Sequence, residues 1–98
     1  MALLDGSERQ AFLESHPGWV LRNETITRTY VLADFASAIG FVAAVGVVAE
    51  RAFHHPDIDI RYRRVTVSLT THDEGGLTRK DADLATRIDR LAGSTPGS

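Results

Sequence analysis

The sequence predicts a single α+β domain: a four-stranded antiparallel sheet covered on one face by helices, in the order α-β-β-α-β-β-α. Its 98 residues, 43% of them hydrophobic, fit one domain. Apolar residues alternate along 57–69 and recur at helical spacing along 84–92. Candidate strands also come in adjacent pairs, which favours hairpins. We expect the domain to span residues 1–93 and the Gly/Ser/Thr/Pro tail 94–98 to be disordered.

Capping signals predict where the first two helices begin. Ser7 followed by Gln10 resembles a capping box, and the helix it opens should end near His16, because a Pro-Gly pair follows. Asp34 can cap a longer helix over 35–53, which must stop before the proline that comes next.

Two hairpins are predicted from turn residues between β-rich segments. Residues 19–22 and 25–31 are rich in aromatic and β-branched side chains and flank Asn23-Glu24. The second pair, 57–62 and 65–69, alternates apolar and polar residues around Arg63-Arg64. Because a two-residue turn usually needs a positive φ, arginine there favours a longer or bulged loop.

The third helix shows the strongest pattern. Thr78 and Asp81 form a capping box, Leu77 and Ala82 can form a hydrophobic staple, and an apolar stripe follows up to Gly93. The expected core comprises Trp19, Tyr30, Phe35, Ile39, Ile60, Val67, Leu69, Leu84, Ile88 and Leu91.

Composition excludes several classes of protein. Eleven Lys and Arg against thirteen Asp and Glu give a net charge of −2, so we expect no nucleic-acid partner. The absence of cysteine excludes disulfides, thiolate zinc sites and a cysteine nucleophile. Charged residues among the first ten argue against a signal segment, so we expect a cytoplasmic protein.

The segment 38–49 contains no charged or polar side chain. It is shorter than the roughly 20 apolar residues of a membrane span, so we expect no membrane insertion. A helix without a polar face must be covered by protein on more than one side. We therefore expect a homo-oligomer.

Three histidines are candidates for acid–base chemistry. His54 and His55 fall where the second helix must end, at the end of the helix dipole that favours positive charge. Glu50 lies one turn before His54, at a spacing that could orient its imidazole. Counting by two from Thr70, His72 falls on the polar face of the last strand. Three imidazoles brought together suit proton transfer.

Other interpretations of the same residues remain open at this point. Two histidines before a proline also occur as a plain helix stop with exposed side chains. Three histidines could bind zinc, although neighbouring histidines diverge and no i,i+4 histidine pair on a helix is present. His16 fits a surface or capping role. The basic run 61–64 is flanked by aspartates and fits a solvated hairpin tip.

The ordered set of these residues resembles the signature of the pterin-4a-carbinolamine dehydratases, and the resemblance covers most of the domain. Its parts are Glu50 to Asp57 with the His-His-Pro core, then Tyr62, Val65, Leu69, Thr71-His72, Gly76-Leu77-Thr78, Asp81, Leu84-Ala85 and Ile88-Asp89. Upstream, Gly18-Trp19, Ile26, Arg28, Tyr30, Asp34-Phe35, Ala38, Phe41 and Ala49 also match. The chain departs from the family pattern at Ile58, often tryptophan in members, and at Arg63, often asparagine.

The resemblance implies dehydration of a 4a-hydroxytetrahydropterin to a quinonoid dihydropterin, in recycling of tetrahydrobiopterin, without metal or cofactor. It implies that His54, His55 and His72 are catalytic. It further implies that Glu50, Pro56 and Asp81 bind or orient the substrate or a histidine. Members of the family form dimers and tetramers. Some relatives are dimerisation or assembly cofactors of another protein, so a non-catalytic scaffold is the alternative function.

Overall fold

The computed structural model describes residues 2–97 and confirms the predicted order of helices and strands. One short 3₁₀ helix, η1, is added before the last helix. The elements are α1 (Gly6–Ser15), β1 (Val20–Arg22), β2 (Thr25–Val31), α2 (Phe35–Ala52), β3 (Asp57–Arg61), β4 (Arg64–Leu69), η1 (His72–Glu74) and α3 (Arg79–Gly93).

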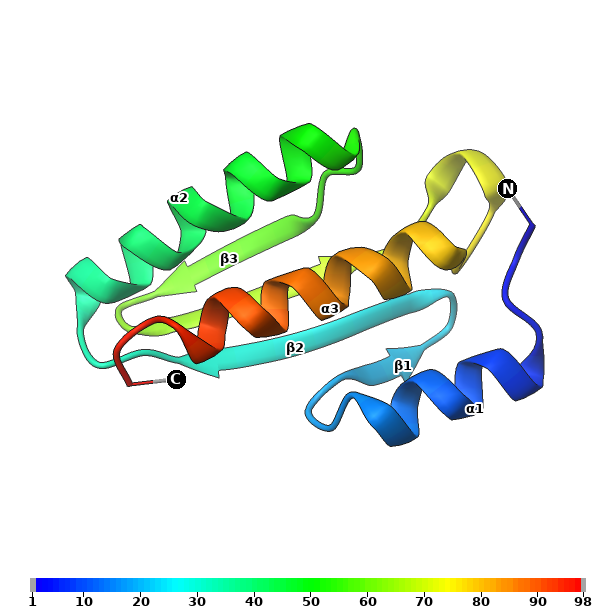
Figure 1. Cartoon of the computed structure of the whole chain (residues 1–98), viewed down its shortest axis with the longest axis horizontal. Coiled ribbons are helices and arrows are strands. Elements are labelled where there is room, and N and C mark those ends of the chain that lie inside the picture. Colours follow the sequence, from blue (N-terminus) through cyan, green and yellow to red (C-terminus); the bar gives the residue numbers. More distant parts are fainter. Residues whose placement is uncertain (1, 98) are drawn as a thin grey trace.

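The four strands form one antiparallel sheet in the order β1-β2-β4-β3, so β2 and β4 are central. Helices α2 and α3 lie across the sheet, and α1 lies near β1 (Figure 1). The alternation predicted for β4 is confirmed, because Val65, Val67 and Leu69 are all buried against the helices. The sheet therefore has one apolar face under the helices.

The predicted N-terminal cap of α1 was wrong. The cap of α1 is Asp5, whose carboxylate accepts the Glu8 N–H at 2.8 Å while the Glu8 carboxylate accepts the Asp5 N–H at 2.9 Å. Ser7 and Gln10, expected to form that box, lie inside the helix. Asp34 and the pair of Thr78 with Asp81 cap α2 and α3 as predicted.

The second hairpin turns one residue earlier than expected, and its loop is a two-residue turn rather than the longer or bulged loop that was predicted. Arg61 pairs with Arg64, so the two-residue turn is Tyr62-Arg63 and Tyr62 takes the positive φ of 55°. The backbone of Arg63 is held to Leu32, whose N–H donates to the Arg63 carbonyl at 2.9 Å. This contact with the residue that follows β2 helps to fix the position of the turn. The alternation of apolar and polar residues within the hairpin could not predict that position.

Three residues expected in the core are exposed: Phe35 (52%), Ile39 (43%) and Ile60 (37%). Phe35 and Ile39 lie on the side of α2 away from the sheet, and Ile60 lies on the edge strand β3. Of the other expected residues, Leu91 packs against the core and the rest are buried. In an all-apolar helix, composition does not say which side faces inward.

Helix α2 has one buried and one uncovered face. Ala38, Phe41, Val45 and Ala49 are buried, and the opposite side includes Val47, 59% exposed. By length and composition alone, this 18-residue helix could cross a membrane. Here it packs against α3 and β4 and so has the arrangement of a core helix with one uncovered apolar side.

The C-terminal half of α3 is tied to the first hairpin by Asp89. Its carboxylate accepts hydrogen bonds from the Trp19 indole at 3.0 Å, Arg28 at 2.9 Å and the Tyr30 hydroxyl at 2.5 Å. Beyond α3, the Pro96 carbonyl accepts the N–H of Ala33 at 2.9 Å. Ser98, the last residue of the tail predicted to be disordered, lies outside the described residues.

Candidate active site

A left-handed residue at the end of α2 sets the direction of the two adjacent histidines. Phe53 has φ 51° and ψ 40°, and its N–H donates back to the carbonyls of Ala49 and Glu50. Such a conformation is uncommon for a residue other than glycine, asparagine or aspartate. The chain therefore leaves the helix axis at Phe53, which sends His54 inward and His55 outward.

His54 is bound to a buried aspartate. Its Nε2 lies 2.5 Å from the Asp81 Oδ1. The side chain of Asp81 is fully buried, and its other oxygen accepts the Thr71 hydroxyl at 2.8 Å and the Thr78 N–H at 3.0 Å. Because an ionised carboxylate only accepts hydrogen bonds, it places the proton on Nε2 and leaves Nδ1 as the second functional nitrogen.

The capping box of α3 is thus part of the site. The sequence predicted that Asp81 pairs with Thr78 in this capping box. In the structure, Oδ2 of Asp81 accepts the Thr78 N–H and closes the box, while Oδ1 holds His54. A rigid helix terminus therefore fixes the position of one imidazole.

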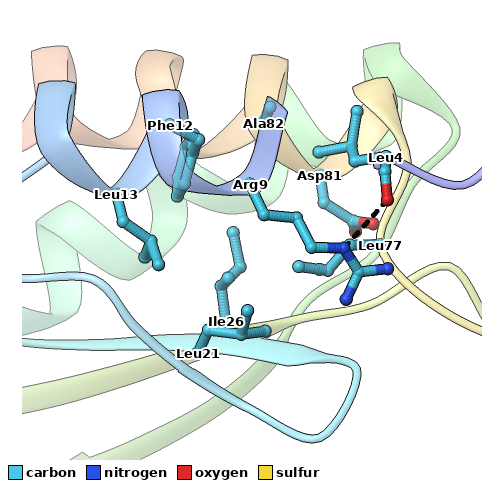
Figure 2. A pocket seen from close by; sticks show the side chains of 9 residues that line it. All are labelled: Leu4, Arg9, Phe12, Leu13, Leu21, Ile26, Leu77, Asp81 and Ala82. Atoms are coloured by element: carbon cyan, nitrogen blue, oxygen red, sulfur yellow. Dashed lines mark hydrogen bonds between the residues drawn. The ribbon is translucent and has the colours of Figure 1, made fainter. Parts of the chain in front are cut away.

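A small apolar cavity lies beside Asp81, between α1 and the sheet (Figure 2). Its volume is about 10 Å³, so it has room for one water at most and cannot hold a heterocycle. Arg9 crosses its edge and donates from Nε to the Leu4 carbonyl at 2.9 Å. The apolar lining keeps bulk water from Asp81, which strengthens the hydrogen bonds of that carboxylate.

The predicted partnership of Glu50 with His54 was wrong. Glu50 Oε1 lies 2.8 Å from Nε2 of His55 instead, and both side chains are exposed. The i,i+4 prediction assumed a helix that continues to residue 54, whereas the left-handed turn at Phe53 ends it. Each of the two adjacent histidines therefore has its own carboxylate, one buried and one at the surface.

His72 lies on η1 rather than on a strand face, because β4 ends at Leu69. Two backbone hydrogen bonds between Thr71 and Gly76, of 3.1 and 3.2 Å, close the loop that carries it. A Cβ on Gly76 would lie 2.0 Å from a carboxylate oxygen of Glu24. That carboxylate is held by two 2.8 Å bonds from Arg9, so the loop needs glycine here and is anchored to the first hairpin.

The three histidines line one pocket, hereafter the histidine pocket, with a volume of about 230 Å³. The sequence did not predict Thr71 and Lys80 as residues of this pocket, although each directly precedes a predicted site residue, His72 and Asp81 respectively. Pro56 follows His55 but is not among the lining residues. The complete lining is Phe53, His54, His55, Thr70, Thr71, His72, Asp73 and Lys80.

His16 is remote from the histidine pocket and has a structural environment. It caps α1, stacks on Phe12 with ring centroids 4.2 Å apart, and its Nε2 lies 2.7 Å from the Thr86 hydroxyl. Within residues 2–97, no three His, Asp or Glu side chains converge as metal ligands would.

Comparison with known proteins points to one family. The sequence profile described as "Pterin 4 alpha carbinolamine dehydratase" matches residues 2–91. A provisionally named pterin-4-alpha-carbinolamine dehydratase of Roseiflexus sp. (strain RS-1) is 53% identical over 88 residues, which are 90% of this chain and 95% of the relative. A protein with the same provisional name from Chloroflexus aurantiacus is 53% identical over 93 residues, 95% of this chain and the whole relative.

Two solved structures are similar as well. A protein from Brucella melitensis described as a transcriptional coactivator/pterin dehydratase has a TM-score of 0.87 and 39% identity, covering 93% of this chain and 99% of its own. A pterin dehydratase-like protein described as a RuBisCO assembly factor has a TM-score of 0.64 and 21% identity, covering 76% of this chain and 87% of its own. The second likeness shows the fold alone.

Proposed function

The chain belongs to the pterin-4a-carbinolamine dehydratase family, and from this premise we propose that it dehydrates a 4a-hydroxytetrahydropterin to a quinonoid dihydropterin by histidine acid–base catalysis. The observation that carries the mechanism is the gathering of His54, His55 and His72 in one pocket. The reaction breaks the bond between C4a and the hydroxyl oxygen. The oxygen leaves as water after receiving a proton, and a ring nitrogen loses a proton to a base.

His54 is the base in this proposal. The hydrogen bond from Nε2 to the buried Asp81 leaves Nδ1 of the neutral imidazole as an acceptor. When Nδ1 takes the proton, the imidazolium lies beside a carboxylate, which stabilises the new charge. Asp81 acts through His54 and is a positioning residue.

The acid is one of the two exposed histidines. His55 and His72 both border solvent, so water can restore the proton that the departing hydroxyl takes. The carboxylate of Glu50 lies 2.8 Å from Nε2 of His55 and so orients the ring of that histidine. Pro56 disfavours helical geometry at His55, the residue before it, and so acts by positioning.

The direct test is stopped-flow measurement of the loss of a freshly generated 4a-hydroxytetrahydropterin against its spontaneous dehydration. We expect acceleration that survives treatment with a chelator, since the proposal uses no metal and no cofactor. No acceleration by well-folded protein would refute the proposed function, and loss of activity on chelation would refute its metal independence.

We also propose that the protein is a homo-oligomer in which the uncovered side of α2 is buried. Phe35, Ile39 and Val47 expose 52%, 43% and 59% of their surfaces along that side. Clustered apolar exposure of this kind marks contact surfaces. Sedimentation of the unmodified chain tests this, and a stable monomer at micromolar concentration would refute it.

A scaffold for another protein remains the second candidate, because the Brucella melitensis relative is described as a transcriptional coactivator as well as a dehydratase. The same uncovered side of α2 could serve such contacts. Folded protein that co-purifies with a defined partner and leaves the dehydration rate unchanged would favour the scaffold. We place the protein in the cytoplasm, where a soluble pterin substrate is accessible.

A further inference from the structure

A second pocket opens beside the histidine pocket, between the last turn of α2 and the first half of α3. Its volume is about 260 Å³, and we call it the basic groove. It shares His54 and Lys80 with the histidine pocket, so one ligand can extend from one into the other. Its lining residues are Arg51, Ala52, His54, Lys80, Asp83, Leu84 and Arg87.

Positive charge is concentrated in this groove, although the whole chain has a net charge of −2. Lys80 and Arg87 lie on one face of α3, seven residues apart, and Arg51 faces them from α2. Asp83 is the one carboxylate in the lining. Three cations against one anion leave an excess of positive charge, and the positive end of the α3 dipole lies nearby at Lys80.

None of the three cations is held in a close ion pair. Among residues 2–97, the exposed side chains of Arg51, Lys80 and Arg87 make no hydrogen bond or ion pair with the protein, and Lys80 has only the longer-range attraction of the Glu74 carboxylate. By contrast, Arg9 and Arg28 are each paired with a carboxylate. The cations of the groove therefore do not have the structural role of Arg9 and Arg28.

We propose that the basic groove binds an anionic group, best a phosphate ester, on the side chain of the pterin whose ring occupies the histidine pocket. This rests on the proposed function. Guanidinium groups present paired N–H donors that match phosphate oxygens, and Lys80 adds a point charge at the border of the two pockets. A neutral hydroxyalkyl side chain would use none of these charges. The groove thus favours phosphorylated pterins over neutral ones.

The test compares the binding of 6-hydroxymethylpterin and its phosphate ester, both followed by pterin fluorescence. We expect the phosphate ester to bind about tenfold more tightly, and high salt to reduce the difference, because the charges are exposed. The double variant Arg51→Gln/Arg87→Gln should bind both pterins equally. Arg90→Gln, a control on α3 outside the groove, should keep the preference.

Inorganic phosphate distinguishes the two possible sources of the anion. We expect it to compete with the phosphate ester and to leave the neutral pterin unaffected. If inorganic phosphate instead strengthens binding of the neutral pterin, the groove accepts a separate anion and the proposal is overturned. Equal binding of the two pterins by the unmodified protein, or a preference that survives the double variant, overturns it as well.

The proposed function is tested separately with the neutral substrate. Acceleration of its dehydration together with equal binding of the two pterins would refute the groove proposal and leave the proposed function standing. If neither pterin binds and no dehydration is accelerated, the proposed function fails and the groove proposal fails with it. A stopped-flow comparison of the neutral and phosphorylated carbinolamines should give the same order of preference in kcat/KM.

Discussion

Neutralising the buried carboxylate with Asp81→Asn should separate its role in positioning His54 from its role in stability. The carboxylate accepts three hydrogen bonds, from His54, from the Thr71 hydroxyl and from the Thr78 N–H. A hydrogen bond to a charged group contributes about 1.5–3 kcal/mol and a neutral one about 0.5–1.5 kcal/mol, so the loss is about 1 kcal/mol for each bond. The free energy of unfolding should therefore fall by about 3 kcal/mol.

The variant should still fold, because a 98-residue domain is stable by about 5–15 kcal/mol. Its dehydration rate should fall about 100-fold or more, since the amide no longer fixes the proton on Nε2 of His54. Stopped-flow kinetics and urea denaturation followed by circular dichroism measure the two effects.

Asp89→Asn is the matched control, because Asp89 lies on the same helix and also accepts bonds from three groups, Trp19, Arg28 and Tyr30. We expect a comparable loss of stability with an unchanged dehydration rate. If Asp81→Asn folds and dehydrates the substrate as fast as the unmodified protein, or if Asp89→Asn slows the reaction equally, the positioning role is refuted.

Three further predictions follow from the fold and the site. Alanine in place of each histidine of the pocket should lower dehydration about 10–10⁴-fold without unfolding, while His16→Ala should leave the rate unchanged; unchanged rates in all three would refute acid–base catalysis. Val47→Lys should dissociate the oligomer in sedimentation experiments, and an unaffected oligomer would show that this side of α2 is not the contact surface. From the sequence alone Val45 is an equivalent position in the apolar segment, but it is fully buried, so a lysine there would instead disrupt the core. Burial, and then the hydrogen bond to Asp89, raise the pKa of Tyr30 above its ordinary value of 10.0, so the folded protein keeps the phenol neutral where the unfolded chain ionises. The contribution of Tyr30 to the free energy of unfolding should therefore be fully present below pH 10, and the free energy of unfolding should fall by up to about 1.4 kcal/mol per pH unit above it. This extra slope should be absent in Tyr30→Phe. Equal slopes for the two proteins in urea denaturation would contradict the assignment.

Much of the site could be predicted from local signals. The helix stop at His54-His55-Pro56 and the capping box of Thr78 with Asp81 are short-range patterns, and both occur where expected. The hydrogen bond between His54 and Asp81 could not be predicted from such local patterns. The two residues are 27 positions apart and meet only when α3 packs against α2. The partner of Glu50 was mispredicted because one left-handed residue at Phe53 changes which histidine faces it.

The order of helices and strands follows from the sequence alone, since periodicity and capping are properties of neighbouring residues. The apolar face of β4 and the apolar stripe of α3 follow from the same local patterns. Which face of α2 is buried depends on packing, because every side of that segment is apolar and only contact with α3 and β4 selects one. Packing also places Lys80 at the border of the histidine pocket and the basic groove, because it brings the two helix ends together.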